Sequence, residues 1–274
     1  MKGPSAIHPY DHGFGTVWNE VSTRTHAGFS TSVTDYHEHG FYEINLILSG
    51  NVRILVGDRS EEGTGSRIVP VRPGTPHFIS CKPDTLYRRK FLCFSEAFVS
   101  DCFPEWATLS RCFSASGISA TLSEAETERF SHLIDEIERE PVLFRKKLLI
   151  YYFLSLLSEV IAKSRPESEA VPAYVVEALR YLEEHYAKRI VASALAEHLH
   201  IGRTALLTAF RRYTDRTLGE YLTQCRLRHA VRLLKSGETL EATAAACGFS
   251  DSSGLVRAFR RAYGMTPKAY TALH

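Results

Sequence analysis

The sequence lacks the features of an exported or membrane-spanning protein. Its first residues, MKGPSAIHPYDHGFG, contain no apolar core of the kind that a signal peptide needs. The most apolar stretch, Leu148–Ile161, is shorter than the ~20 residues that a bilayer requires, and tyrosine, serine and glutamate interrupt it. We therefore expect a soluble, cytoplasmic protein that does not bind a membrane.

Paired cysteines are also missing. No two cysteines stand in a C-x-x-C pair, the spacing typical of zinc sites. The six are scattered along the chain, at Cys81, Cys93, Cys102, Cys112, Cys225 and Cys247. In a chain of 274 residues, such cysteines indicate reduced thiols rather than a disulfide framework.

The chain has little net charge, but its total of +2 hides an uneven distribution. Residues 1–170 carry 18 Lys and Arg against 22 Asp and Glu, whereas residues 171–274 carry 15 against 9. The net charges of the two parts are therefore −4 and +6. A basic C-terminal part favours a polyanionic partner. With 44% apolar residues, the chain is long enough for one large domain or two modest ones.

Short apolar runs predict an all-β region between about residues 16 and 95. Examples are Tyr42–Leu48, Val52–Val56 and Arg67–Val71, which are separated by turn residues such as Gly50 and Gly57. Many short strands with turns between them are typical of a sandwich or a small barrel.

Two helices are predicted after this region. Ser123 and Glu126 have the spacing of a capping box, and apolar residues then recur at helical intervals. Pro141 ends the first helix, and a more apolar one extends to about Ala162. The amount of apolar surface favours a dimer interface. The alternative, that the helices only cover the β-region, stays open. A polar linker at 165–171 then separates a domain at 1–164 from a helical one at 172–274.

An internal repeat carries the strongest functional signal. Ala209-Phe210-Arg211-Arg212 recurs 49 residues later as Ala258-Phe259-Arg260-Arg261. The same shift aligns Ala196 with Ala245, Leu206 with Leu255, Thr217 with Thr266 and Tyr221 with Tyr270. Each copy reads as helix, turn, helix, with second helices at 203–213 and 251–263, the latter capped by Ser250. This pattern predicts two DNA-binding helix-turn-helix units. The alternative is a helical domain with a solvated basic face.

Residues 172–274 resemble the DNA-binding domain of AraC/XylS-type transcription regulators. The resemblance rests on Leu195-Ala196 and Arg226-Leu227, and above all on Cys247–Ser253, Phe259-Arg260-Arg261, Gly264, Thr266-Pro267 and Tyr270. On this reading we expect base contacts from Arg203, Thr204 and Thr208 in the first unit and from Ser252, Ser253 and Arg257 in the second. Arg211, Arg212, Arg260 and Arg261 are expected at phosphates. Gly202 departs from the family's usual capping serine, which predicts a loose start of the first recognition helix.

The β-region resembles the cupin barrels. His37-Glu38-His39 with Glu43 and Gly50 is similar to their first motif, and Pro73-Gly74-Thr75-Pro76-His77 is similar to their second. Such residues can bind a divalent metal such as Fe, Mn or Ni, which makes His37, His39, Glu43 and His77 possible metal ligands. The favoured interpretation is a metal-free pocket for a small polar molecule such as a sugar. Its expected lining residues are His37, His39, Glu43, Asn45 and His77.

The sequence thus predicts an α+β protein of two domains. A cupin-like β-barrel with a helical hairpin precedes an all-α double helix-turn-helix domain. The resemblance implies a ligand-responsive transcription regulator, and we expect an activator of genes for uptake or breakdown of its effector. It would act as a homodimer on promoter DNA with RNA polymerase, without a cofactor and without enzyme activity. Two alternatives stay open: a metal-dependent cupin enzyme fused to a DNA-binding domain, and a ligand-independent DNA binder whose barrel only dimerises.

Overall fold

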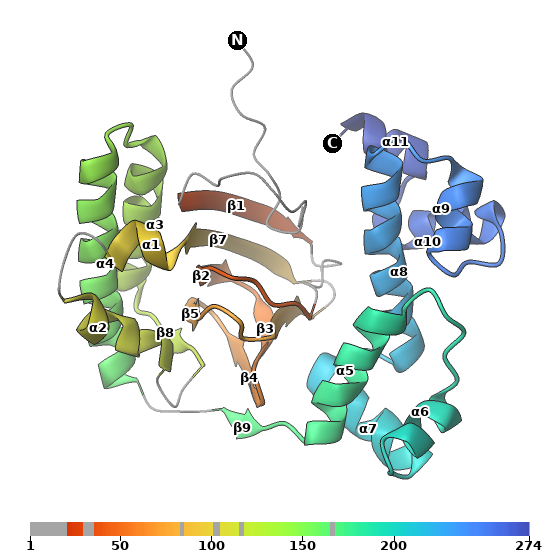
Figure 1. The fold of residues 1–274 in the computed structure, drawn as a ribbon. Coiled ribbons are helices and arrows are strands. Elements are labelled where there is room, and N and C mark those ends of the chain that lie inside the picture. The colour runs from red at the N-terminus through yellow and green to blue at the C-terminus, as the bar shows by residue number, and fades with distance from the viewer. Residues whose placement is uncertain are drawn as a thin grey trace. The chain divides into compact units, whose positions relative to one another are not determined.

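The computed structural model describes most of the chain (Figure 1). The described residues are 21–29, 36–82, 85–100, 105–114, 118–164 and 168–273. By compactness they divide into one unit that ends at Leu222 and a second that begins at Thr223. Within the described ranges, no helix is both long and apolar enough to span a bilayer.

The first unit contains an antiparallel sheet of five strands. Their order across the sheet is β1 (Val21–Phe29), β7 (Leu86–Phe94), β2 (Tyr42–Ser49), β5 (Arg67–Val71) and β8 (Ala120–Thr121). In β2, alternate side chains face opposite sides. Tyr42 and Ile44 join the apolar cluster against the helices, whereas Ile47 belongs to a second cluster that includes Val52 and Ile54 of the other sheet.

The other sheet has four described strands. Their order is β6 (His77–Cys81), β3 (Asn51–Val56), β4 (Arg59–Thr64) and β9 (Glu169–Ala170). The predicted β-rich region is therefore present, as two sheets that do not close into one continuous barrel. Strand β9 lies in the segment predicted as a linker and pairs with β4. Residues 165–167 of that segment lie outside the described residues.

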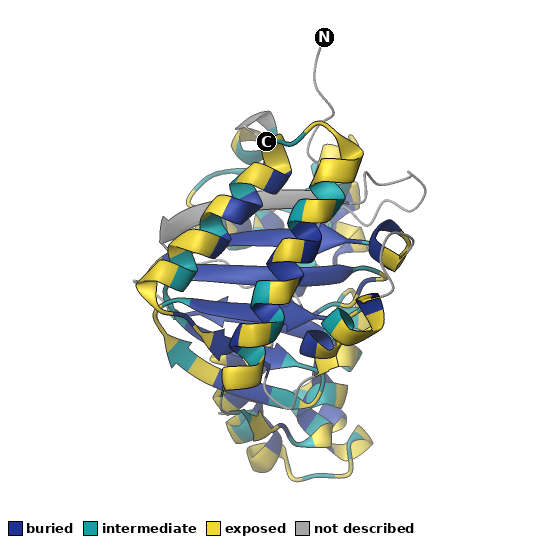
Figure 2. Cartoon of the chain, turned by 90° about the vertical axis from the view of Figure 1, so that its left-hand side faces the viewer, coloured by how far each residue is buried: buried dark blue, intermediate teal, exposed yellow. Residues whose placement is uncertain are grey.

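A helical hairpin covers the outer face of the five-stranded sheet (Figure 2). It consists of α3 (Glu124–Arg139) and α4 (Leu143–Lys163), and the shorter α1 (Glu96–Ser100), α2 (Trp106–Leu109) and η1 (Ser110–Ser114) precede it. The predicted capping box is present, since Glu126 N–H donates to Ser123 Oγ and Ser123 N–H donates to the Glu126 carboxylate. Phe130, Leu133, Ile134 and Ile137 of α3 are buried, as their spacing predicted.

The rest of the described chain is helical apart from β9. The first helix-turn-helix unit comprises α5 (Ala173–His185), α6 (Ala192–His198) and α7 (Arg203–Thr214). The second comprises α9 (Leu240–Ala246), α10 (Ser252–Tyr263) and α11 (Pro267–Leu273). Helix α8 (Leu218–Lys235) contains the boundary between the two compact units. Helices α7 and α10 each have 12 residues and begin 49 positions apart, which agrees with the shift of the sequence repeat.

Candidate functional site

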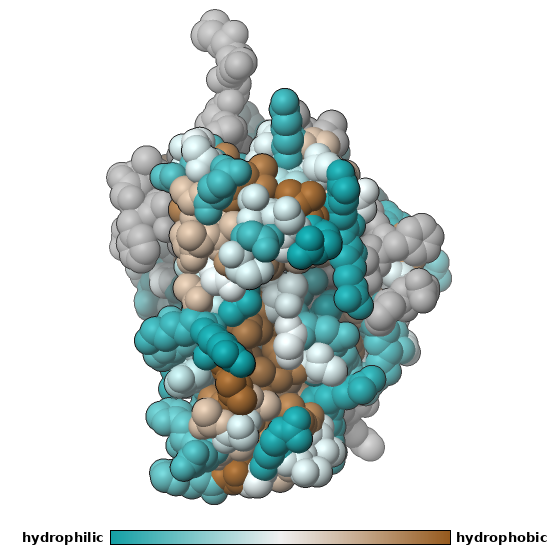
Figure 3. Space-filling model, turned by 90° about the vertical axis from the view of Figure 1, so that its right-hand side faces the viewer, coloured by the Kyte–Doolittle hydropathy of each residue, from teal (hydrophilic) through white to brown (hydrophobic). Residues whose placement is uncertain are grey.

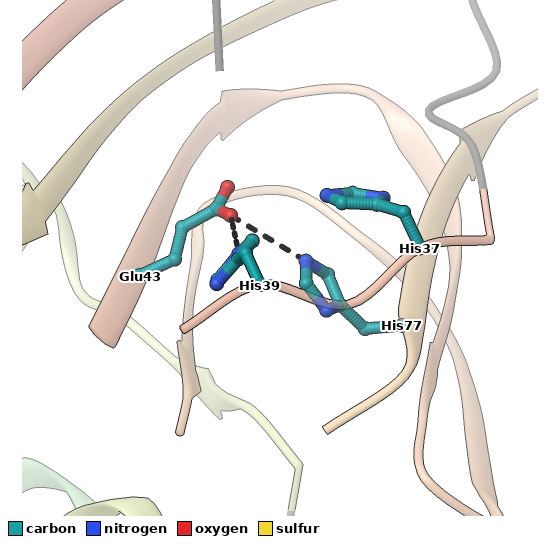
Figure 4. Close-up of side chains that lie close together, drawn as sticks. All are labelled: His37, His39, Glu43 and His77. Carbon is teal, nitrogen blue, oxygen red and sulfur yellow. Dashed lines mark hydrogen bonds and ion pairs between the residues drawn. The ribbon is translucent and has the colours of Figure 1, made fainter. Parts of the chain in front are cut away.

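Four side chains predicted to line the ligand pocket lie together in the compact unit that contains the β-sheets (Figure 4). Glu43 comes from β2 and His77 from the start of β6, while His37 and His39 lie in the segment before β2. One possible ligand atom from each residue lies within 4.8 Å of those of the other three. Two backbone hydrogen bonds fix His37 beside His77. His37 N–H donates to His77 O at 3.0 Å, and His77 N–H donates to His37 O at 2.9 Å.

Two of the three imidazoles are fixed by backbone carbonyls. His39 Nδ1 donates to Phe41 O, and His77 Nδ1 donates to Thr75 O, both at 2.9 Å. Because a carbonyl oxygen only accepts, each Nδ1 carries a proton and each Nε2 is left to face the cluster. The Oε2 atom of Glu43 lies 2.7 Å from His39 Nε2 and 3.4 Å from His77 Nε2.

Glu43 is a charged group in an almost dry environment, with only 4% of its surface exposed. Burial raises its pKa, but the interactions with His39 and His77 outweigh this effect and hold the pKa of Glu43 well below its ordinary value. The cluster therefore contains a buried carboxylate that requires positive charge beside it.

Asn45 lies two residues beyond Glu43 on β2 and is 1% exposed. Its Oδ1 atom accepts a hydrogen bond from Arg89 at 3.2 Å, whereas its Nδ2 atom is buried without a partner among the described residues. Asn45 therefore places an unsatisfied hydrogen-bond donor on the same strand as Glu43, two residues along.

In the first helix-turn-helix unit, α7 separates a buried side from an exposed one. Leu206 and Phe210 are fully buried and anchor the helix. The residues predicted to contact DNA are all exposed: Arg203, Thr204, Thr208, Arg211 and Arg212. Four of them, all but Thr204, line an open groove of about 980 Å³, with Lys82 also at its wall. The helical region presents long hydrophilic side chains among apolar ones (Figure 3).

In the second unit, α10 repeats this division. Leu255 and Phe259 are fully buried, and Ser253, Arg257, Arg260 and Arg261 are exposed, whereas Ser252 is half-buried. The prediction that Ser250 caps this helix is wrong. Asp251 adopts the extended N-cap conformation, and its Oδ1 atom accepts the Gly254 N–H at 2.6 Å.

The start of α7 has no such cap. Gly202 occupies the N-cap position and provides no side chain to accept a backbone N–H. The C-terminus differs too, since Asp215 with φ 56° follows α7, whereas Gly264 with φ 70° follows α10. Glycine adopts this left-handed conformation without a steric cost, but aspartate does not.

Sequence reasoning missed the contacts between the β-sheets and α7. Buried Arg53 of β3 donates to Asp215 at 3.0 Å and to Glu62 at 2.8 Å. Arg212, predicted to contact phosphate, donates to Glu169 of β9 at 2.7 Å. Arg53 and Asp215 lie 162 residues apart in sequence, and Arg212 and Glu169 lie 43 apart, so no local pattern signals either pairing.

A second missed contact begins beside the four-residue cluster. The N–H of Tyr36, the residue before His37, donates to the hydroxyl of Tyr221 at 3.2 Å. That hydroxyl donates to Glu183 of α5 at 2.7 Å, and the ring of Tyr221 packs edge-on against Phe210 of α7 with centroids 5.6 Å apart. Tyr36 therefore links His37 of the cluster to Tyr221, and Tyr221 contacts Phe210, which anchors the first recognition helix.

Comparison with known proteins agrees with this arrangement. Residues 21–154 match the AraC-like ligand binding domain, and residues 195–272 match a helix-turn-helix domain. Three similar relatives are the HTH-type transcriptional regulator YobQ of Bacillus subtilis, the Msm operon regulatory protein of Streptococcus mutans and the HTH-type transcriptional activator RhaS of Escherichia coli.

The likeness to these relatives extends over most of each chain. YobQ is 23% identical over 85% of this chain and 87% of its own length. The Msm regulator is 22% identical over 84% and 83%, and RhaS is 23% identical over 85% and 85%. With both domains matched in the order that the fold presents, the chain belongs to the AraC family of transcription regulators.

Proposed function

We propose that this regulator binds promoter DNA with both helix-turn-helix units and responds to a small polar effector bound near the four-residue cluster. The observation that carries this proposal is the repeated division of α7 and α10 into a buried apolar side and an exposed basic side. RhaS is named as a transcriptional activator, which supports activation as the direction of regulation. The effector-binding domain comprises residues 1–164, and the DNA-binding domain comprises residues 172–274.

The exposed residues of the two helices divide into two roles. Residues at the start and middle of each helix contact base edges: Arg203, Thr204 and Thr208, and Ser252, Ser253 and Arg257. The arginines of the last turn contact phosphates and fix the register of the helix: Arg211, Arg212, Arg260 and Arg261.

The effector contacts His37, His39, Glu43, Asn45 and His77. These residues offer both donors and acceptors on a largely buried surface, which suits a small hydroxylated molecule such as a sugar. The unsatisfied Nδ2 atom of Asn45 supports this assignment, since an acceptor on the effector would complete its hydrogen bonding.

Effector binding reaches the first recognition helix through Tyr36 and Tyr221. A shift of His37 moves the N–H of Tyr36, and this N–H holds the hydroxyl of the tyrosine that packs on Phe210. The coupling acts by favouring one arrangement of α7 over another.

The protein acts as a homodimer in the cytoplasm and contacts RNA polymerase. Helix α4 carries an exposed apolar stripe that fits a second copy of the same helix. Phe144, Leu148 and Tyr152 recur every four residues along it and are 61%, 41% and 45% exposed. Exposed residues of α4 lie on the side that faces away from the sheet (Figure 2).

The test begins with selection of DNA from a random duplex pool by the full chain. We expect enrichment of a defined sequence. Arg257→Ala should weaken binding to that sequence by about 1–3 kcal/mol, a contribution typical of one base contact, and should change binding to scrambled DNA far less. Arg260→Ala is the matched control, since loss of a phosphate contact weakens both equally. No enrichment, or equal losses in Arg257→Ala, would overturn the proposal.

A further inference from the structure

We propose that the effector is a hydroxylated carboxylic acid whose carboxylate binds Arg89 of β7 and Asn45 of β2. This inference rests on the proposed function for the presence of an effector in the unit that contains the β-sheets, and it goes further by naming the chemical class of that molecule. It also adds a residue, Arg89, that the sequence motifs did not mark.

Arg89 and Asn45 lie on neighbouring strands and on the same side of the five-stranded sheet. Asn45 pairs with Phe91 of β7, and Ile47 of β2 pairs with Arg89. Residues paired across an antiparallel ladder share a face, as do residues two apart along one strand. Ile47 belongs to the apolar cluster that includes residues of both sheets. Asn45 and Arg89 therefore face the interior between the sheets.

Arg89 brings a positive charge into this interior, where it is only 6% exposed. Its guanidinium lies over the rings of Phe91 and Tyr87, 5.5 and 6.0 Å from their centroids, and donates to Asn45 Oδ1 at 3.2 Å. An arginine has five N–H donors in a rigid fork that matches the two oxygens of a carboxylate. A dry environment strengthens the attraction between this cation and an anion.

The amide of Asn45 places an unsatisfied donor beside that cation. Arg89 can only donate, so the amide oxygen must face the guanidinium, which fixes the orientation of the Nδ2 group. This Nδ2 group is buried without a hydrogen-bond partner among the described residues. A hydroxyl oxygen of an effector would satisfy the amide alone, whereas a carboxylate would satisfy the amide and also interact with the charge of Arg89.

Glu43 sets the orientation and the size of the acid. It lies on the same side of β2, two residues before Asn45, which is a separation of about 7 Å along a strand. Its buried carboxylate repels an anion and accepts hydrogen bonds from hydroxyl groups. The effector therefore places its carboxylate at Asn45 and Arg89 and its hydroxyl groups at Glu43. This span corresponds to a chain of about five or six carbons, the size of a sugar acid.

The experiment compares acids with their neutral counterparts on the full chain. Titration calorimetry measures galacturonate against galactose, glucuronate against glucose, and gluconate against glucitol. We expect at least one acid to bind on the order of 10- to 100-fold more tightly than its counterpart, because hydrogen bonds to a charged group contribute this much. Binding by none of the acids, or binding of the neutral molecules that is equally tight, would overturn the proposal.

Removal of the charge tests the role of Arg89. Arg89→Met keeps most of the side-chain volume and should weaken binding of the acid on the order of 10- to 100-fold. Binding of the neutral counterpart should change far less. Arg88→Met is the matched control, since Arg88 is an exposed arginine of the same strand and should not affect either ligand. Unchanged binding of the acid by Arg89→Met would contradict the proposal.

Asn45→Asp gives a test that needs no ligand and changes the shape of the side chain very little. Its carboxylate should pair with Arg89, so the thermal midpoint of the effector-free chain should stay the same or rise, and binding of the acid should be lost. A midpoint lowered by several degrees would show that Arg89 does not accept an anion there, which would overturn the proposal. Selection of a DNA sequence by the wild type would leave the proposed function intact, so the two can fail separately.

Discussion

The two helix-turn-helix units are built to the same plan but stabilised differently. Helices α7 and α10 have equal lengths and equivalent buried anchors, Phe210 and Phe259. The second helix contains its own end signals, Asp251 at the start and Gly264 at the end. The first has no side-chain cap at its start, and Asp215 rather than a glycine adopts the left-handed conformation after its end.

Helix α7 has no side-chain cap at its start, but it contacts residues of the β-sheet region. Asp215 at its end is bound by Arg53, and its anchor Phe210 packs on the tyrosine that holds Tyr36. A helix with weak ends and external contacts responds to its surroundings, whereas a self-capped helix does not. Under the proposed function, this comparison predicts that effector binding changes the DNA contacts of the first helix-turn-helix unit more than those of the second.

The largest expected effect comes from removing the two buried anchors, Phe210 and Phe259, one at a time. Phe210→Ala and Phe259→Ala should each cost about 3–5 kcal/mol of stability in their own unit. The chain has two tryptophans, and Trp106 is buried in the compact unit that contains Phe210, so both variants are made in a Trp18→Phe background in which Trp106 alone reports. In urea, Phe210→Ala should shift the fluorescence transition as well as the circular dichroism, and Phe259→Ala should shift the circular dichroism alone. Equal shifts of the fluorescence transition in the two variants would contradict the claim that only the first helix-turn-helix unit is coupled to the β-sheets.

Loss of the second unit's own cap should give the next effect. Asp251→Ala should reduce the exchange protection of the first turn of α10 by about 0.5–2 kcal/mol and leave α7 unchanged. Ser250→Ala is the matched control, since Ser250 does not accept the Gly254 N–H. A larger loss of exchange protection in Ser250→Ala than in Asp251→Ala would show that Ser250 caps α10.

Removal of the contact between β3 and α7 should have a smaller effect. Arg53→Gln should lower the exchange protection of the last turn of α7 by about 0.2–1 kcal/mol. The effect is small because Asp215 and Glu62 are partly exposed, so solvent screens their ion pairs with Arg53. Lys82→Gln, which removes an exposed ion pair with Glu62, should leave α7 as it is. Unchanged protection in Arg53→Gln would show that α7 does not depend on the sheet.

The smallest effect concerns Gly202. Gly202→Ser adds a capping hydroxyl and should stabilise the start of α7 by a few tenths of a kcal/mol, while Asp251→Gly should cost α10 a similar amount. Hydrogen exchange of the two first turns measures both. Destabilisation of α7 by the serine would show that its start is set by contacts other than capping.

The sequence allowed prediction of local features and of the repeat. The capping box at Ser123 and the anchors Leu206, Phe210, Leu255 and Phe259 follow from spacing, because a helix brings residues three and four apart to one side. The cap of α10 was misassigned because Ser250 and Asp251 are both good caps, and only the backbone conformation decides between them.

Long-range contacts were beyond sequence reasoning. The pairs Arg53 with Asp215 and Tyr36 with Tyr221 are separated by 162 and 185 residues, and each depends on how whole elements pack. The four-residue cluster was found because motif spacing marked its members. The fixed Nδ1 atoms, which give it its chemistry, depend on carbonyls of Phe41 and Thr75 that no motif names.

Footprinting of the selected DNA duplex tests the central claim most directly, namely that both units of this regulator read one DNA. The account predicts two protected major-groove segments about 10 base pairs apart on one face of the duplex. Arg203→Ala should remove protection of one segment, and Arg257→Ala should remove protection of the other. A single protected segment, or loss of the same segment in both variants, would contradict the account.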